Sequence, residues 1–192
     1  GKREAITSKS LNESNWSSLT YWPWNVLIHG QYVREDQLDS FKDLDVIASL
    51  FPLHTFYWGD WHKEIIGDSL GNTISPTRTA LNKGLKITIH TDAPVALPNL
   101  MRMVGISVDR KSRSGKVIGE HEKLTPYEAL QSITSWSAYQ HFEEDQKGTL
   151  QEGKLADMVI LDKNPLKISP TEIKEIVVLE TIKEGVSVYK KK

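Results

Sequence analysis

Histidine and aspartate follow a short apolar segment near the middle of the chain, where they could carry acid–base or metal chemistry. Ile87 and Ile89 are typical of a strand interior, and His90 and Asp92 come directly after them. Two residues apart in extended backbone, these two side chains share one face. Pro94 lacks an amide hydrogen, so we expect the strand to end before it. A carboxylate there is typical of the active-site end of a (β/α) barrel strand, although an aspartate before Ala-Pro is also common in polar surface turns.

Two earlier apolar segments are also followed by histidine. The run that starts at Asn25 ends in His29, and the run Val46–Phe51 is followed closely by His54. Three of the six histidines therefore stand at the ends of predicted strands. A single histidine is usually a hydrogen-bonded structural residue, but three in this position favour a polar cluster at one mouth of a barrel.

Helix signals separate the predicted strands. Residues 35–44 place apolar side chains at helical spacing. A second helix is predicted from Ser75, as N-cap, and Pro76, in the first helical position, to a stop at Gly84. The residues after His54 are expected to form a long loop. This alternation of strands and helices predicts an α/β fold with a parallel sheet or barrel.

The middle of the chain combines a predicted loop with a predicted helix. Residues 95–125 look like a loop, and the basic run Arg110–Gly115 within it is interpreted as mobile and charged. Thr125 and Glu128 match a capping box, which predicts that a helix follows. In that helix Trp136 is expected to be a packing residue.

The C-terminal residues predict a small sheet. Asp157–Leu161, Ile176–Ile182 and Val186–Tyr189 are expected strands, and Gly185 supplies the positive φ that a tight turn between the last two requires. Three strands can bury one face. Asp157 is expected to bond backbone at the strand entry and to take no part in catalysis.

Composition excludes several classes of function. Hydrophobic residues make up 39% and charged residues 26%, which is ordinary for a globular chain. A net charge of −1 argues against nucleic acid or an anionic membrane as a partner. No apolar run approaches the length of a transmembrane helix, and no signal peptide is visible. Cysteine is absent, which excludes disulfides and a cysteine nucleophile and fits a cytoplasmic protein.

Four segments of this sequence resemble the amidohydrolase superfamily: Ile28–Gln31, His54–Trp61, His90–Pro94 and Gly148–Asp162. More narrowly, they resemble its branch of N-acyl-cleaving or formamide-cleaving metal-dependent hydrolases, which includes proteins named as exoenzyme regulators. The resemblance covers roughly residues 26–189. It implies an α/β fold: the C-terminal portion of a (β/α)8 TIM-type barrel in residues 25–147, and part of a small β-sandwich in residues 148–192. Residues 1–24 are predicted to be a flexible N-terminal segment.

The resemblance also implies roles for the residues at the strand ends. His29 matches the metal ligand on the sixth barrel strand. Asp92 matches the metal ligand and general base on the eighth. His54 and His90 would contact substrate at the barrel mouth. The family implies a divalent metal, zinc above others, and a small-molecule amide as substrate.

The sequence departs from the family pattern in its length and its ligand set. Family members are longer and carry a His-x-His on the first strand, with further ligands on the fourth and fifth. This chain starts just before the sixth strand and has no His-x-His. A catalytic zinc normally needs three protein ligands, so we expect this chain alone to bind metal weakly or not at all and to be inactive. Exposed strand edges predict self-association. The alternative is a non-catalytic or regulatory fragment of the same fold that binds a partner.

Overall fold

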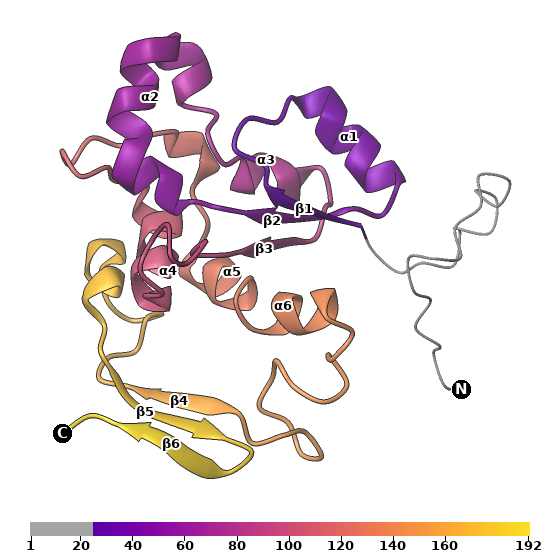
Figure 1. Ribbon diagram of the computed structural model, residues 1–192, viewed down its shortest axis with the longest axis vertical. Coiled ribbons are helices and arrows are strands. Elements are labelled where there is room, and N and C mark those ends of the chain that lie inside the picture. The colour runs from indigo at the N-terminus through magenta and orange to yellow at the C-terminus, as the bar shows by residue number, and fades with distance from the viewer. Residues whose placement is uncertain (1–24) are drawn as a thin grey trace, which may run out of the picture.

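Three parallel strands form the first of two small sheets (Figure 1). The computed structural model describes residues 25–192, so the predicted flexible segment 1–24 lies outside the described residues. Strand β1 (Val26–His29) pairs with β2 (Ile47–Leu50), which pairs with β3 (Ile87–Ile89). All residues of β2 and β3 are buried, which explains why both strands are short and mostly apolar.

Helices connect these strands, as the alternating pattern predicted. Helix α1 (Glu35–Asp43) joins β1 to β2, and helices α2 (Leu53–Gly71) and α3 (Thr77–Asn82) join β2 to β3. The expectation of a long loop after His54 is wrong, because these residues form the 19-residue helix α2. Its clustered aromatic residues leave no clean division into an apolar and a polar face, so periodicity gave no helix signal. The helix kinks at Gly67, whose φ is 81°.

The predicted start of α3 is also wrong. Ser75 has a φ of 49°, and its hydroxyl donates a hydrogen bond of 3.0 Å to the carbonyl of Phe51 instead of capping the helix. The helix therefore begins at Thr77, after Pro76 in the capping position. The predicted stop is confirmed, since Gly84 follows the helix with a φ of +82° that favours glycine.

Three further helices lie between the two sheets (Figure 1). They are α4 (Leu100–Asp109), α5 (Pro126–Gln131) and α6 (Ser135–Gln140). The expectation of a loop over residues 95–125 is wrong, because α4 is a mostly buried helix that packs into the core. The side chain of Asn99 caps it, accepting from the Arg102 amide at 2.9 Å. At the start of α5 the capping box of Thr125 and Glu128 is confirmed.

The hydrophobic core joins the first sheet to these helices. Leu50 and Ile87 from the strands meet Val104 of α4 in the larger cluster of buried residues. Trp136 packs against this cluster, which confirms its interpretation as a packing residue. A second cluster, with Phe51 and Met103 among its members, lies where β2 gives way to α2. Within residues 25–192, no helix combines the length and apolar character needed to cross a membrane.

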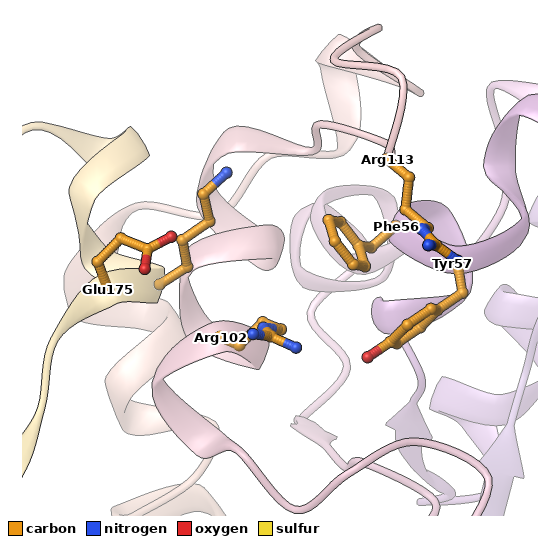
Figure 2. A pocket seen from close by; sticks show the side chains of 6 residues that line it. Phe56, Tyr57, Arg102, Arg113 and Glu175 are labelled. Atoms are coloured by element: carbon orange, nitrogen blue, oxygen red, sulfur yellow. The ribbon is translucent and has the colours of Figure 1, made fainter.

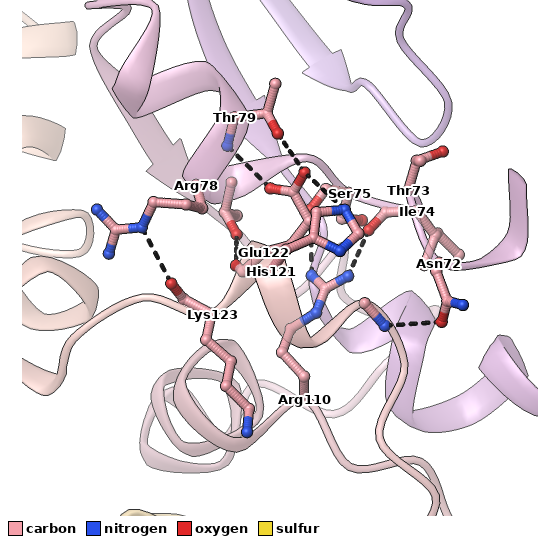
Figure 3. Close-up of polar contacts among 12 residues, drawn as sticks. Asn72, Thr73, Ile74, Ser75, Arg78, Thr79, Arg110, His121, Glu122 and Lys123 are labelled. Atoms are coloured by element: carbon pink, nitrogen blue, oxygen red, sulfur yellow. Dashed lines mark hydrogen bonds and ion pairs between the residues drawn. The ribbon is translucent and has the colours of Figure 1, made fainter. Parts of the chain in front are cut away.

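A buried ionic network holds the segment after α4 in place (Figure 3). Arg110 is 0% exposed and donates hydrogen bonds to the backbone carbonyls of Ile74, Ser75 and Ile118 at 2.6, 3.1 and 2.9 Å. The interpretation of Arg110 as part of a mobile charged loop is therefore wrong. Burial lowers the pKa of its guanidinium to about 10, so the group stays protonated at neutral pH.

Glu122 supplies the negative charge of this network. It lies in the 3-10 helix η2 (Glu120–Glu122) and is 1% exposed. Its carboxylate accepts hydrogen bonds from the amide and the hydroxyl of Thr79, and its carbonyl accepts from the Thr77 hydroxyl at 2.5 Å. The network thus ties η2 to the start of α3.

The second sheet is antiparallel, with the order β4-β5-β6. It consists of β4 (Met158–Leu161), β5 (Val178–Lys183) and β6 (Val186–Lys190), which confirms three predicted strands. Glu184 and Gly185 form the two-residue turn, with φ values of 50° and 79°. The Glu184 amide donates to Asp157 at 2.8 Å, as expected for a carboxylate at a strand entry. Between β4 and β5, the 3-10 helix η3 (Pro170–Glu175) packs against α4.

Candidate metal centre

The predicted polar residues meet at the carboxyl edge of the parallel sheet. His29 is the last residue of β1, and His90 directly follows β3. The His90 amide donates to the carbonyl of Leu50 at 3.1 Å, so the ladder with β2 extends one residue past the strand. Because neighbouring parallel strands end at the same edge, their last side chains converge there. Turns in the left-handed region at His29 (φ 74°) and Asp92 (φ 54°) complete the arrangement.

These two backbone conformations are a sign of a constrained site. Residues other than glycine seldom adopt φ values between +50° and +70°, and such residues cluster at functional sites. The unusual φ of His29 stands at the last residue of β1, and that of Asp92 opens a turn in which its carbonyl accepts from the Val95 amide at 2.7 Å. The expectation that His90 and Asp92 share one face of an extended strand is therefore wrong in detail, because the strand ends at Ile89. The two side chains nevertheless converge.

The side chains form a continuous polar chain. Nδ1 of His29 lies 2.9 Å from Nε2 of His90, and Nε2 of His29 lies 3.9 Å from a carboxylate oxygen of Asp92. Taken together, one ligand atom from each of the three residues lies within 4.8 Å of the other two. On the far side, Nδ1 of His90 lies 3.1 Å from the hydroxyl of Ser49.

The hydrogen bonds that link Ser49, His90 and His29 can run in either of two directions. If Ser49 donates to His90, then His90 donates to His29, whose remaining N–H faces Asp92. If His90 donates to Ser49, the direction between the two imidazoles reverses. In both settings one nitrogen of each ring is an acceptor, which is the form that a metal ion requires.

His54 approaches this cluster from a helix. It lies in the first turn of α2, so its placement at a strand tip is wrong by a few residues, yet its ring centroid is 6.4 Å from that of His29. The ring packs 4.2 Å from Phe51, centroid to centroid. Its Nδ1 is buried and has no hydrogen-bond partner among the described residues. Burial, helped by the neighbouring histidines, lowers the pKa of His54 to about 4, so its imidazole is neutral at neutral pH.

Two residues of this site, Ser49 and Phe51, were not predicted from the sequence. Ser49 is 5% exposed and stands in the middle of β2, where a lone hydroxyl within an apolar strand could have marked it. Phe51 stacks on His90 with ring centroids 5.4 Å apart and an interplanar angle of 21°. It looked like an ordinary strand residue, and only the three-dimensional packing reveals that it touches both His54 and His90.

The donor set fits a divalent transition metal. Two imidazole nitrogens and one carboxylate oxygen are ligands that zinc prefers, and a catalytic zinc uses three such ligands and one open position. Two nitrogens bound to one tetrahedral zinc lie about 3.4 Å apart. The 2.9 Å between Nδ1 of His29 and Nε2 of His90 is a hydrogen-bond distance, so for these two nitrogens to bind one ion the rings would have to move apart and the shared proton would have to leave.

Comparison with known proteins finds hydrolytic enzymes. The N-substituted formamide deformylase of Arthrobacter pascens is 26% identical over 166 residues, which cover 86% of this chain and 31% of that protein. Imidazolonepropionase of Streptococcus sanguinis is 27% identical over 139 residues, which cover 70% of this chain and 27% of that protein. This chain thus spans about a third of the length of the curated relatives it matches.

Solved structures agree. An uncharacterized metal-dependent hydrolase from Pyrococcus horikoshii superposes with a TM-score of 0.67 and 27% identity, covering 80% of this chain and 31% of the other. These similarities confirm the predicted fold class, part of a (β/α)8 barrel. The sequence model of the amidohydrolase family matches residues 17–189, nearly the whole chain. The chain therefore belongs to the amidohydrolase family.

Proposed function

We propose that this chain is part of a metal-dependent hydrolase that cleaves carbon–nitrogen bonds in small non-peptide amides. One observation supports this above the others: His29, His90 and Asp92 bring their ligand atoms within 4.8 Å at the carboxyl edge of a parallel sheet. That edge is where (β/α) barrel enzymes place their chemistry. The relative that is named for deformylating N-substituted formamides supports an amide-type substrate.

In this proposal His29 and Asp92 hold the divalent metal, which we propose to be zinc. A bound zinc ion lowers the pKa of a coordinated water and polarises the carbonyl of the substrate. His29 is suited to this role because its ring reaches both His90 and Asp92 from the end of β1. Its side chain is 43% exposed, which leaves the site open to a ligand.

Asp92 is the proposed general base. Its carboxylate is 32% exposed, so one oxygen can face a metal while the other faces solvent. It would accept the proton of the attacking water and pass that proton to the leaving amine. His54 and His90 would contact the substrate at the mouth. The neutral imidazole of His54 has a buried Nδ1 without a hydrogen-bond partner among the described residues, which leaves it able to bond a substrate polar group that displaces its cover.

We further propose that the site is completed by parts of a longer protein. The chain spans about a third of its relatives, and His29 and Asp92 supply only two of the three protein ligands that normally hold a catalytic zinc. In this division residues 25–147 are the barrel portion, and residues 148–192 contribute to a β-sandwich. The 192 residues alone would then show no hydrolysis and would tend to self-associate through uncovered strand edges.

The decisive experiment replaces the proposed base. In a protein of the relatives' full length that carries this segment, Asp92→Asn should lower the rate of hydrolysis of an N-substituted formamide by about 10²–10⁴-fold, because general-base catalysis is lost while the shape is kept. Asp157→Asn, in the second sheet, is the matched control and should leave turnover unchanged. Near-normal turnover of Asp92→Asn would show that this carboxylate is not the base. No turnover in the unchanged full-length protein would favour the regulatory alternative.

A further inference from the structure

A cavity of about 370 Å³ opens between α2, the start of α4, the turn after α4, and η3 (Figure 2). It is separate from the group of His29, His54, His90 and Asp92, which we call the strand-end cluster, because none of these residues lines it. Its walls are two aromatic, three cationic and one acidic residue: Phe56, Tyr57, Arg102, Arg113, Lys174 and Glu175. We call it the arginine cavity.

The two arginines of this cavity differ from every other arginine that the structure describes. Arg34 and Arg78 each pair with a carboxylate, and Arg110 bonds backbone carbonyls. Within residues 25–192, the side chains of Arg102 and Arg113 make no hydrogen bond and no ion pair. Two unpaired guanidinium groups beside one cavity create a positive potential that attracts anions.

Arg113 is held in position by its neighbours. Its amide donates to the carbonyl of Phe56 at 3.0 Å, which fixes the turn against α2. The hydroxyl of Ser114 donates to Asp60 of the same helix at 2.8 Å, and the Ser112 amide donates to the carbonyl of Lys116 at 2.8 Å. A turn anchored on both sides keeps the Arg113 backbone in place, which lowers the entropic cost of binding a ligand.

The third cation reaches the cavity because two elements pack unusually closely. At Gly105 of α4, a methyl group would lie 2.7 Å from the backbone nitrogen of Lys174, so only glycine allows η3 to pack there. Lys174 shares its charge with the buried Asp109, whose carboxylate lies 3.9 Å from the ammonium group. The single acidic wall residue, Glu175, leaves the cavity with a net positive charge.

The aromatic wall suits a flat ligand. The ring centroids of Phe56 and Tyr57 lie 4.9 Å apart and the ring planes meet at 83°. The edge of one ring therefore points at the face of the other. A planar ring can stack on one of them and touch the edge of the other. Figure 2 shows the Tyr57 and Arg102 side chains reaching into the cavity from different helices.

We propose that the arginine cavity binds a small organic anion, with its phosphate or carboxylate group on Arg102 and Arg113 and its planar apolar body against Phe56 and Tyr57. Guanidinium groups bind both oxyanions through paired hydrogen bonds, so they define the shared chemistry of the ligand. This inference is independent of the proposed hydrolase function, because it uses none of the metal-site residues.

Binding of three probes to the 192-residue chain tests the proposal: phenyl phosphate, benzoate and inorganic phosphate, followed by calorimetry and by amide chemical shifts. Phenyl phosphate or benzoate should bind saturably, shift the amides of Arg113 and Tyr57, and bind more tightly than inorganic phosphate. Whichever of the two aromatic probes binds more tightly identifies the preferred oxyanion. Added salt should weaken binding.

Variants locate the site. Arg113→Ala should weaken binding of the better aromatic probe by about tenfold, because one charge-assisted contact is lost. Arg113 lies on an exposed turn, so its loss should not affect folding, and Arg102→Gln provides a second test. Arg34→Ala, which removes the same charge elsewhere, should leave binding unchanged. Saturable binding that survives both cavity substitutions, or no saturable binding of either aromatic probe, would overturn the proposal.

Discussion

The strand-end cluster and the Arg110 network are both built from ionisable side chains, yet they differ in how fully those groups are bonded. Arg110 is fully buried, and three backbone carbonyls accept its hydrogen bonds. His29 is 43% exposed on its side chain, and its closest carboxylate lies 3.9 Å away, beyond hydrogen-bond distance. His54 has a buried nitrogen without a partner among the described residues.

This difference separates structural from functional polar groups. A buried charge costs so much free energy that it persists only when hydrogen bonds compensate it, and in Arg110 each of the three guanidinium nitrogens makes one. A polar cluster that is open and incompletely bonded keeps bonding capacity for a ligand. The same contrast holds among the arginines, because all three guanidinium nitrogens of Arg110 donate hydrogen bonds, whereas the side chains of Arg102 and Arg113 bond none of the residues that the structure describes.

The largest expected effect tests the structural side of the comparison. Arg110→Met should lower the free energy of unfolding by about 3–5 kcal/mol, measured by urea denaturation. Methionine fills a similar volume, but the buried carbonyls of Ile74 and Ile118 would lose the donor that the structure gives them, and the Ser75 carbonyl would keep only the Thr77 amide, at 2.8 Å. The exposed Arg34→Ala is the control and should have a much smaller effect, because a surface ion pair contributes little to stability. A loss under 1 kcal/mol for Arg110→Met would mean that the segment can rearrange and solvate those carbonyls.

The sequence predicted the strand-end residues better than the buried network, for a physical reason. Strand ends are marked locally, by apolar runs that stop at His29 and His90, and parallel topology then brings them together. Arg110 stands in a basic run that is typical of a surface loop. Nothing in its local sequence indicates that its side chain donates hydrogen bonds to three distant carbonyls. Helix α2 was missed because its aromatic residues obscure its periodicity. The role of Ser49 depends on which residue of β3 lies beside it, a matter of register that spacing alone does not give.

The second test uses the pH dependence of the stability that the partly buried ion pair Arg78–Glu128 contributes. The Arg78 guanidinium, helped by hydrogen bonds from Thr125, lowers the pKa of Glu128 from its ordinary 4.5 to about 2. Because the folded state binds this proton less well, the stabilisation is fully present above pH 4.5 and is lost as the pH falls toward 2. Glu128→Gln should therefore cost about 2 kcal/mol of unfolding free energy at pH 7 and almost nothing near pH 2.

The difference between wild-type and variant, measured by urea unfolding at several pH values, isolates Glu128 from the other carboxylates. Glu120→Gln is the control, since Glu120 makes an exposed pair with Lys123 and should give a small difference at every pH. A Glu128→Gln difference that stays constant down to pH 2.5 would show that this carboxylate is not held ionised by Arg78.

The third test concerns zinc binding at the proposed metal site. His90 is proposed above as a substrate contact, yet its ligand atom lies within 4.8 Å of those of His29 and Asp92. If His90 also binds the metal, its bond to Ser49 orients the ring, and Ser49→Ala should weaken zinc binding by about tenfold, the lower end of the effect of outer-shell partners. Titration of the chain with zinc, or with cobalt followed by absorbance, measures the affinity. Ser107→Ala is the matched control, because this buried hydroxyl bonds only the carbonyl of Met103 within α4. Equal zinc affinity of wild-type and Ser49→Ala would separate Ser49 and His90 from the metal site.

The smallest expected effect concerns Asp157, a carboxylate that, like Asp92, stands near the end of a strand but accepts a backbone hydrogen bond. Asp157 precedes β4 and accepts the Glu184 amide at 2.8 Å, at the turn between β5 and β6. Asp157→Ala should lower the free energy of unfolding by about 1 kcal/mol, and Asp157→Asn by less, because asparagine keeps an oxygen acceptor. Neither change should alter zinc affinity, since Asp157 belongs to the second sheet. Altered zinc binding by Asp157→Ala with unchanged stability would reverse the assignment, and with it the rule that a satisfied carboxylate is structural and an open one is functional.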